Sequence, residues 1–202
     1  MTTPAPFAPS NLLLVKDFFD AETCARIIAE MRSAWGGPAT VYKPGAKSPV
    51  DESLRKTTRL MLSDETSEFV RRRLLERKAA VEEYFRVGLG GCEDPQFLRY
   101  EAGDFFVAHQ DGNSQALEFD HLRIRRVSVV IFLSSQAEAP APGAYGGGSL
   151  VFFDPGVSTD RRELGLSLRG EAGTFVAFRA ETVHEVTPVT HGERHSVVCW
   201  YR

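Results

Sequence analysis

Apolar residues in roughly the first ninety positions recur every three or four places, which is the spacing of a helix with one buried face. In the first such segment they are Cys24, Ile27, Ile28 and Met31. Asp20 stands just before them and can cap the first turn, so the pattern predicts a helix over 20–34. In the second segment they are Phe69, Val70, Leu74, Val81 and Phe85, which predict a helix over 65–86.

From Gln96 onward the apolar residues form short runs separated by glycine and proline. Eight runs are typical of strands, namely QFLRYE, DFFVAH, RIRRVSVVIFLS, GSLVFF, LGLSLRG, GTFVAF, TVHEVTPV and RHSVVCWY. They predict a mainly β fold of the α+β class, with a β-sandwich or jelly-roll core at 96–202 and helical support at 20–86 packed outside it. The stretch SSQAEAPAPGAYGGG is rich in Ala, Pro and Gly and is expected to be a flexible surface loop.

The length of 202 residues predicts a single domain, which we place at 11–202. Residues 1–10, MTTPAPFAPS, contain three prolines and are expected to form a flexible leader. This leader has neither a basic start nor an apolar stretch, and no apolar run in the chain reaches about 18 residues. Export and membrane insertion are therefore not expected.

Composition places the chain among ordinary globular proteins, with 43% hydrophobic and 25% charged residues. A net charge of -3 gives no indication of a nucleic-acid or membrane surface. Three cysteines, Cys24, Cys92 and Cys199, are widely scattered and lack the spacing of a zinc site or a disulfide framework. A reducing, cytoplasmic location is therefore expected.

Two histidines and an aspartate in the second half of the chain form a pattern of possible metal ligands. His109 and Asp111 are two positions apart in FFVAHQDG, and such side chains point to the same face of a strand. TFVAFRAETVHEVTPV can supply His184 from another strand. Two imidazoles and one carboxylate are the facial triad that holds non-haem Fe(II) and leaves positions open for other ligands. Ten residues later, Arg194 can present a guanidinium to a carboxylate.

Five segments in fixed order carry a resemblance to a known family: RYEAGDFFVAHQD, RRVSVVIFLS, GGGSLVFF, EAGTFVAF and VHEVTPVTHGERHSVVCWYR. Over roughly 11–202 the chain resembles the Fe(II)/2-oxoglutarate-dependent dioxygenases, and within them the prolyl-4-hydroxylase-like branch. The resemblance implies a double-stranded β-helix core. It also implies Fe(II) bound by His109, Asp111 and His184, 2-oxoglutarate as cosubstrate, O2, and ascorbate as reductant. For the His-x-Asp pair alone, a buried hydrogen-bonded pair is the alternative reading.

The resemblance extends to four further residues. Arg194 would bind the distal carboxylate of 2-oxoglutarate, where many relatives carry lysine, and the hydroxyl group of Tyr100 would approach the same molecule. Ser149 takes the place of a family threonine, and Trp200 that of a tryptophan lining the pocket. The alternatives are that Tyr100 and Trp200 are core residues and that Ser149 is structural. His195 alternates away from Arg194 and is expected to face solvent.

The implied reaction is hydroxylation of an aliphatic C–H bond, with succinate and CO2 as coproducts. The branch suggests a peptidyl prolyl residue as substrate. A free amino acid or small metabolite is the alternative, and a non-catalytic barrel that senses 2-oxoglutarate or oxygen is a third reading. Two segments could contact substrate: DGNSQALEFDHLRIRR as a lid, and VYKPGAKSPVDESLRKTTR, whose Arg55, Lys56 and Arg59 could meet an acidic group.

Overall fold

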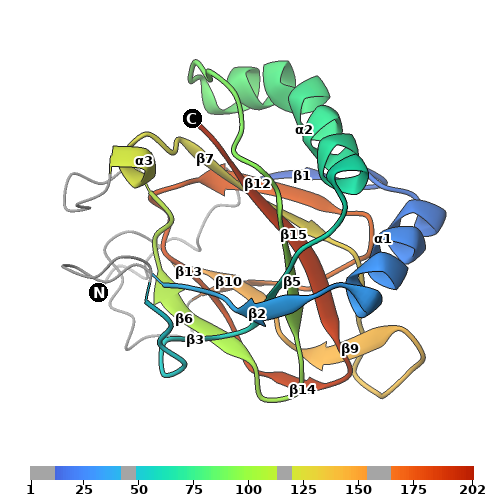
Figure 1. The fold of residues 1–202 in the computed structure, drawn as a ribbon. Helices are drawn as coiled ribbons and strands as arrows, with labels where there is room; N and C mark the ends of the chain where they lie inside the picture. Colours follow the sequence, from blue (N-terminus) through green and yellow to red (C-terminus); the bar gives the residue numbers. More distant parts are fainter. Residues whose placement is uncertain (1–11, 42–48, 113–119, 154–164) are drawn as a thin grey trace, which may run out of the picture.

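Two β-sheets enclose the centre of the molecule, and two helices cover the outer side of the larger sheet in a computed structural model (Figure 1). The structure describes residues 12–41, 49–112, 120–153 and 165–202. The expected leader at 1–10 and the middle of the expected lid, 113–119, lie outside these ranges. Within them, the predicted jelly-roll arrangement with external helices is confirmed.

The helices begin and end close to where the apolar spacing places them. Helix α1 spans Ala21–Ser33, and the Asp20 carboxylate accepts a hydrogen bond of 2.8 Å from the Thr23 amide, as an N-cap does. Helix α2 spans Asp64–Phe85 and ends at Arg86, whose left-handed backbone stops the helix. A four-residue helix, α3, follows at Asp120–Arg123.

The strands form three sheets. In the seven-stranded sheet the order is β1 (Leu12–Val15), β12 (Phe175–Arg179), β7 (Val127–Phe132), β15 (Arg194–Tyr201), β5 (Gln96–Tyr100), β4 (Thr58–Leu60) and β2 (Gly36–Pro38). The five-stranded sheet has the order β11 (Leu166–Leu168), β10 (Leu150–Phe152), β13 (His184–Val186), β6 (Phe105–His109) and β3 (Arg55–Lys56). The smallest contains β14 (Val189–His191), β9 (Ala144–Gly147) and β8 (Ser135–Gln136).

Strand β15 at the middle of the large sheet separates two apolar regions. Its side chains alternate between faces, as the period of a strand requires. Val197, Cys199 and Tyr201 pack with α1 and α2 in one core cluster. On the opposite face, Arg194 and Trp200 line a cavity between the sheets, so the predicted shared face of these two residues is confirmed.

The prediction of a flexible surface loop for SSQAEAPAPGAYGGG is wrong at both ends of the stretch, whereas its middle, 138–143, is an exposed connection between strands. This stretch contains β8 and β9, which pair in parallel, and Tyr145 within it is fully buried. β9 also pairs with β14. The composition concealed these strands because both are short and β9 contains two glycines. Their pairing, the buried Tyr145 ring and hydrogen bonds of Gln136 hold them in place.

The prediction that His195 faces solvent is also wrong, although the side chain does alternate away from Arg194. His195 is only 1% exposed. Alternation fixes which residues share a face, but it does not say whether that face is covered, and here residues of α1 line a small cavity together with His195. Burial lowers the pKa of His195 to about 4, despite Glu193 Oε2 at 3.9 Å.

We predict that His195 makes stability depend on pH in a defined window. The folded-state pKa is about 4 and the unfolded value about 6.5, so both states are neutral at pH 7. Below about pH 6.5 the unfolded chain takes up a proton at this residue and the folded protein does not. The free energy of unfolding therefore falls by roughly 2 kcal/mol by pH 5. Urea unfolding of wild type and His195→Gln at both pH values measures this. The variant should lose about 2 kcal/mol less on acidification, and an equal loss in both proteins would contradict the prediction.

Candidate metal centre and cosubstrate pocket

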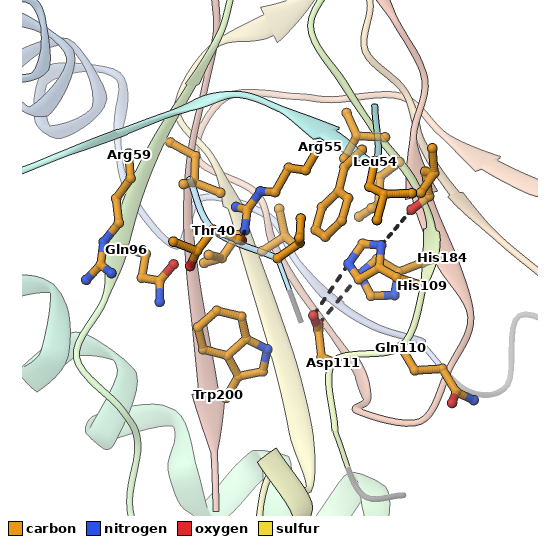
Figure 2. Close-up of a pocket in the computed structure, with 18 of the residues that line it drawn as sticks. Thr40, Leu54, Arg55, Arg59, Gln96, His109, Gln110, Asp111, His184 and Trp200 are labelled. Carbon is orange, nitrogen blue, oxygen red and sulfur yellow. Dashed lines mark hydrogen bonds and ion pairs between the residues drawn. The ribbon is translucent and has the colours of Figure 1, made fainter. Parts of the chain in front are cut away.

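The register of β13 and β6 brings two histidines together. His184 is the direct cross-strand partner of His109, and their ring centroids are 4.3 Å apart. Asp111 follows β6 by two residues and turns back toward both rings, while Gln110 between them points away and donates to the Glu181 carbonyl (Figure 2). Residues 75 positions apart in sequence are therefore neighbours in the fold because one ladder joins them.

The geometry of these three side chains suits a metal ion. Asp111 Oδ1 lies 3.5 Å from His109 Nε2, and Asp111 Oδ2 lies 3.6 Å from His184 Nε2. One potential ligand atom from each residue falls within 4.8 Å of the others. A metal with bonds of about 2 Å fits between atoms at such separations, and the nitrogen–oxygen donor set is one that non-haem Fe(II) uses.

Local backbone contacts fix which ring nitrogen is available. His109 Nδ1 lies 2.8 Å from the Val107 carbonyl oxygen, and His184 Nδ1 lies 2.9 Å from the Thr182 carbonyl oxygen. A carbonyl only accepts, so Nδ1 carries the proton in both rings and donates it. The lone pair of each Nε2 is thereby left for a metal, which is the usual arrangement for ligating histidines.

The charge states also fit metal binding. Burial raises the pKa of the Asp111 carboxyl group, but the adjacent His184 and His109 outweigh it, and the net pKa lies well below the ordinary value. Burial lowers the pKa of His184 to about 4, and the nearby His109 acts in the same direction. At neutral pH the site therefore offers a carboxylate and a neutral His184 imidazole, the forms that bind a metal.

The backbone of Asp111 is held firmly. Its amide donates to the Ala180 carbonyl at 2.9 Å, and its own carbonyl accepts from Arg125 Nη1 at 3.2 Å. Gly112 follows in a space where a Cβ atom would lie 2.5 Å from the Leu122 carbonyl oxygen, so only glycine fits. The third ligand is thus positioned from both sides although it lies beyond the end of its strand.

Arg194 is a buried cation that faces the same cavity. It is 1% exposed, donates to Ser196 Oγ at 2.9 Å, and lies 5.1 Å from the ring centroids of both Tyr100 and Phe132. Its Nε has no hydrogen-bond partner, and no carboxylate in the described ranges pairs with it. A buried charge without a counter-ion is costly. The arrangement therefore suits an anion that enters the cavity.

Tyr145 lies beside Arg194 and was missed by the sequence reasoning. A Cβ atom on Gly148 would come within 3.2 Å of the Tyr145 ring and 3.0 Å of Arg194 Cδ, so both side chains pack against this glycine. Burial raises the pKa of Tyr145, and Arg194 offsets only part of the rise. The phenol is therefore neutral at physiological pH and does not supply the missing counter-ion. Its position in a glycine-rich stretch gave no sequence signal.

The other predicted site residues divide into two groups. Tyr100 and Trp200 line the cavity with the three possible ligands and Arg194, and the cavity holds about 620 Å³. Tyr100 is the cross-strand partner of Arg194. Ser149 is not among the lining residues, and its hydroxyl group accepts from Gln136 Nε2 at 3.0 Å. Its proposed contact with the cosubstrate stays a prediction.

Arg125 and Glu93 form a second arrangement that the sequence reasoning missed. Arg125 Nε and Nη2 donate to the two Glu93 oxygens at 2.8 and 2.7 Å, and the guanidinium carbon lies 3.6 Å from the Trp200 ring centroid. Both residues line the cavity. This bidentate pair holds the indole in place and, through the Asp111 carbonyl, also supports the candidate metal site.

Comparison with known proteins decides the family. Residues 95–202 match the sequence model of the 2OG-Fe(II) oxygenase superfamily. The chain belongs to this superfamily. A PKHD-type hydroxylase of Burkholderia lata is 36% identical over 107 residues, which make up 52% of this chain and 41% of that protein. The match thus spans about two fifths of the relative's length.

Solved structures show the same fold for this superfamily member. A prolyl-4-hydroxylase of Pseudomonas putida superimposes with a TM-score of 0.69 at 22% identity, covering 95% of this chain and 92% of that one. A prolyl hydroxylase of Trichoplax adhaerens, solved with a peptide of a hypoxia inducible factor, gives a TM-score of 0.70 at 14% identity, covering 95% and 83%. The double-stranded β-helix core expected from the sequence is thereby confirmed.

We predict that each of His109, Asp111 and His184 is required for metal binding. Replacing any one with Ala should reduce affinity by more than the ~10–100-fold that loss of an outer hydrogen-bond partner costs, since a direct ligand is removed. Asp111→Glu should fail nearly as badly because one methylene displaces the oxygen. Co(II) absorption titrations measure this, with His191→Ala as control outside the cavity. Wild-type affinity in His184→Ala would refute the ligand assignment.

Proposed function

We propose that this protein is an Fe(II)- and 2-oxoglutarate-dependent dioxygenase that hydroxylates an aliphatic C–H bond. The observation that carries the proposal is a buried Arg194, without a carboxylate partner among the described residues, in the same cavity as the His109, Asp111 and His184 cluster. A metal triad and a separate cation together match a cosubstrate that chelates a metal at one end and carries a carboxylate at the other. Membership of the 2OG-Fe(II) oxygenase superfamily supports the same reading.

In this proposal each part of the pocket has a defined task. His109, Asp111 and His184 hold the iron through two imidazole nitrogens and one carboxylate oxygen. Arg194 binds the distal carboxylate of 2-oxoglutarate, its orientation fixed by Ser196 and by the rings of Tyr100 and Phe132. When bound, iron with 2-oxoglutarate and O2 would supply the oxidising power that places one oxygen atom in a C–H bond and releases succinate and CO2.

Part of the cavity wall is apolar. Leu98, Val130 and Leu150 contribute apolar side chains that are at most 6% exposed. In such surroundings the attraction between Arg194 and a carboxylate is stronger than in water. The protein therefore acts by binding, orienting and desolvating the reactants, and no acid or base residue beyond the metal centre is assigned.

The substrate we propose first is a peptidyl prolyl residue. Support comes from the prolyl hydroxylases with the same fold, one of which was solved with a peptide. A free amino acid or small metabolite is the second candidate, and the charged Arg55 and Arg59 line the cavity that it would enter. Substrate oxidation with a gain of one oxygen in mass spectrometry of incubated extracts identifies the target.

We also propose ascorbate as the reductant that keeps the iron ferrous, and a cytoplasmic location. Support for the location comes from three free cysteines, Cys24, Cys92 and Cys199. Across the ranges that the structure describes, no helix combines the length and apolarity needed to cross a bilayer.

Turnover tests the proposed function directly. Iron-loaded protein is supplied with 2-oxoglutarate, O2 and a broad set of peptides and amino acids, and succinate is measured. We expect succinate to form above the level of the His184→Ala protein and to depend on O2. If wild type and variant release the same trace amount with every candidate substrate, the non-catalytic sensor reading replaces the enzyme.

We predict that Arg194 controls binding of 2-oxoglutarate and not of iron. Removing one partner of a buried charge pair costs ~2–5 kcal/mol, or about 30- to several-thousand-fold in affinity. Arg194→Ala should therefore weaken 2-oxoglutarate binding by that factor while metal affinity stays nearly unchanged. Arg194→Lys should lose less, although an ammonium group cannot form the forked contact. Anaerobic titration followed at the chelate absorption band measures both constants. An unchanged dissociation constant in Arg194→Ala would place the carboxylate elsewhere.

A further inference from the structure

Two arginines line the cavity on the side formed by β3 and β4. Arg55 comes from β3 and Arg59 from β4. Arg59, Gln96 and Thr40 lie across the cavity from His109 and Asp111, and the Arg55 side chain extends from beside Leu54 toward Thr40 (Figure 2). Strand register explains the position of Arg59. It pairs with Leu98, so its side chain shares a face with the cavity-lining residues of β5.

Arg55 is held in a defined orientation close to the metal site. Its Nη1 donates to the Thr40 carbonyl at 3.0 Å, and its guanidinium carbon lies 4.6 Å from the centroid of the Phe106 ring. Phe106 in turn stacks on His109, with centroids 3.5 Å apart. Because these two steps are 4.6 and 3.5 Å, the guanidinium carbon lies within about 8 Å of the His109 ring.

Within the part of the chain that the structure describes, neither arginine has a negative partner. No carboxylate of the described residues pairs with Arg55 or Arg59, and Arg55 Nε is buried without a hydrogen-bond partner. Lys56, the residue beside Arg55, differs because it forms an ion pair of 3.1 Å with Asp104. The sequence predicted three basic residues that could meet an acidic group. Because Lys56 is already paired, two of them, Arg55 and Arg59, remain for that role.

Counted over the described residues that line it, the charges of the filled cavity leave these two arginines in excess. Fe(II), the Asp111 carboxylate, doubly charged 2-oxoglutarate and Arg194 together carry no net charge. Glu93 neutralises Arg125 through two hydrogen bonds. Two positive charges, on Arg55 and Arg59, therefore face the space that a substrate would enter, and the neighbouring Gln96 amide can also donate to an anion.

We infer that the substrate carries an anionic group, a carboxylate in the first instance, which Arg55 and Arg59 bind while the C–H bond to be oxidised lies at the metal. The inference rests on the proposed function, since it concerns the same cavity. The short span from Arg55 to the His109 ring requires the anionic group to be only a few bonds from the reacting carbon. A free amino or carboxylic acid meets this condition, and so does a peptide with an acidic residue next to the target.

Matched pairs of ligands that differ only in charge test the inference. Protein holding Zn(II) in place of iron, with saturating 2-oxoglutarate, binds without turnover and leaves Arg194 occupied. One arm offers L-proline and L-leucine against their primary amides. The other offers a pool of short amidated prolyl peptides with Glu or Gln flanking the proline. Equilibrium dialysis with mass spectrometry gives the acid-to-amide binding ratio in each arm.

Five proteins are compared: wild type, Arg55→Gln, Arg59→Gln, the double variant, and Lys56→Gln as the control for a neighbouring positive charge. We expect wild type and Lys56→Gln to bind the acid at least about tenfold more tightly than the amide in one arm. One charge-assisted hydrogen bond contributes a free energy of that size. Each single variant should reduce the ratio and the double variant should bring it near one. Unchanged binding of 2-oxoglutarate verifies that the variants are folded.

The arm that shows the preference identifies the source of the anionic group, free acid or acidic peptide. No preference for the acid in either arm, or an undiminished preference in the double variant, overturns the inference. The succinate assay separates this result from the proposed function. Turnover without acid preference refutes the anionic substrate alone, whereas acid preference in a protein that never forms succinate refutes the enzyme alone.

Discussion

The cross-strand pairing of His184 with His109 is the constraint on which the candidate site depends. A shift of β13 by one residue would turn His184 to the opposite side of the sheet and leave the other two ligands without it. The ladder is irregular between His184 and Val186, and this irregularity accompanies the stacking of Phe106 on His109. In a regular strand, residues three apart face opposite ways. The local distortion thus aligns a packing residue with a ligand.

Strand β15 links this site to the rest of the fold. One of its faces seals the helical core through residues such as Tyr201, whose hydroxyl group donates to the Leu74 carbonyl. Its other face presents Arg194 and Trp200 to the cavity. The helices therefore do more than cover a sheet, because their packing holds the strand from which the cation and the indole project.

Much of this architecture was predictable because it follows from spacing. Helical periodicity located α1 and α2 to within a residue or two, and the two-residue alternation placed Arg194 and Trp200 on one face. Features that depend on tertiary contacts were not predictable. The burial of His195 depends on where α1 packs, and strands β8 and β9 exist only through their partners. The Arg125–Glu93 pair joins residues that no local pattern relates.

Both candidate histidine ligands are oriented by carbonyl groups of the main chain, two residues before each ring. A carbonyl oxygen is present whatever side chain its residue carries. Substitutions at Val107 or Thr182 therefore leave the ring orientation and tautomer in place, whereas an orienting carboxylate could be lost by a single mutation. Mutation of these neighbouring residues therefore does not change which ring nitrogen, Nε2, is left to bind a metal. Evolution can reshape the wall around the metal without having to rebuild the ligands themselves.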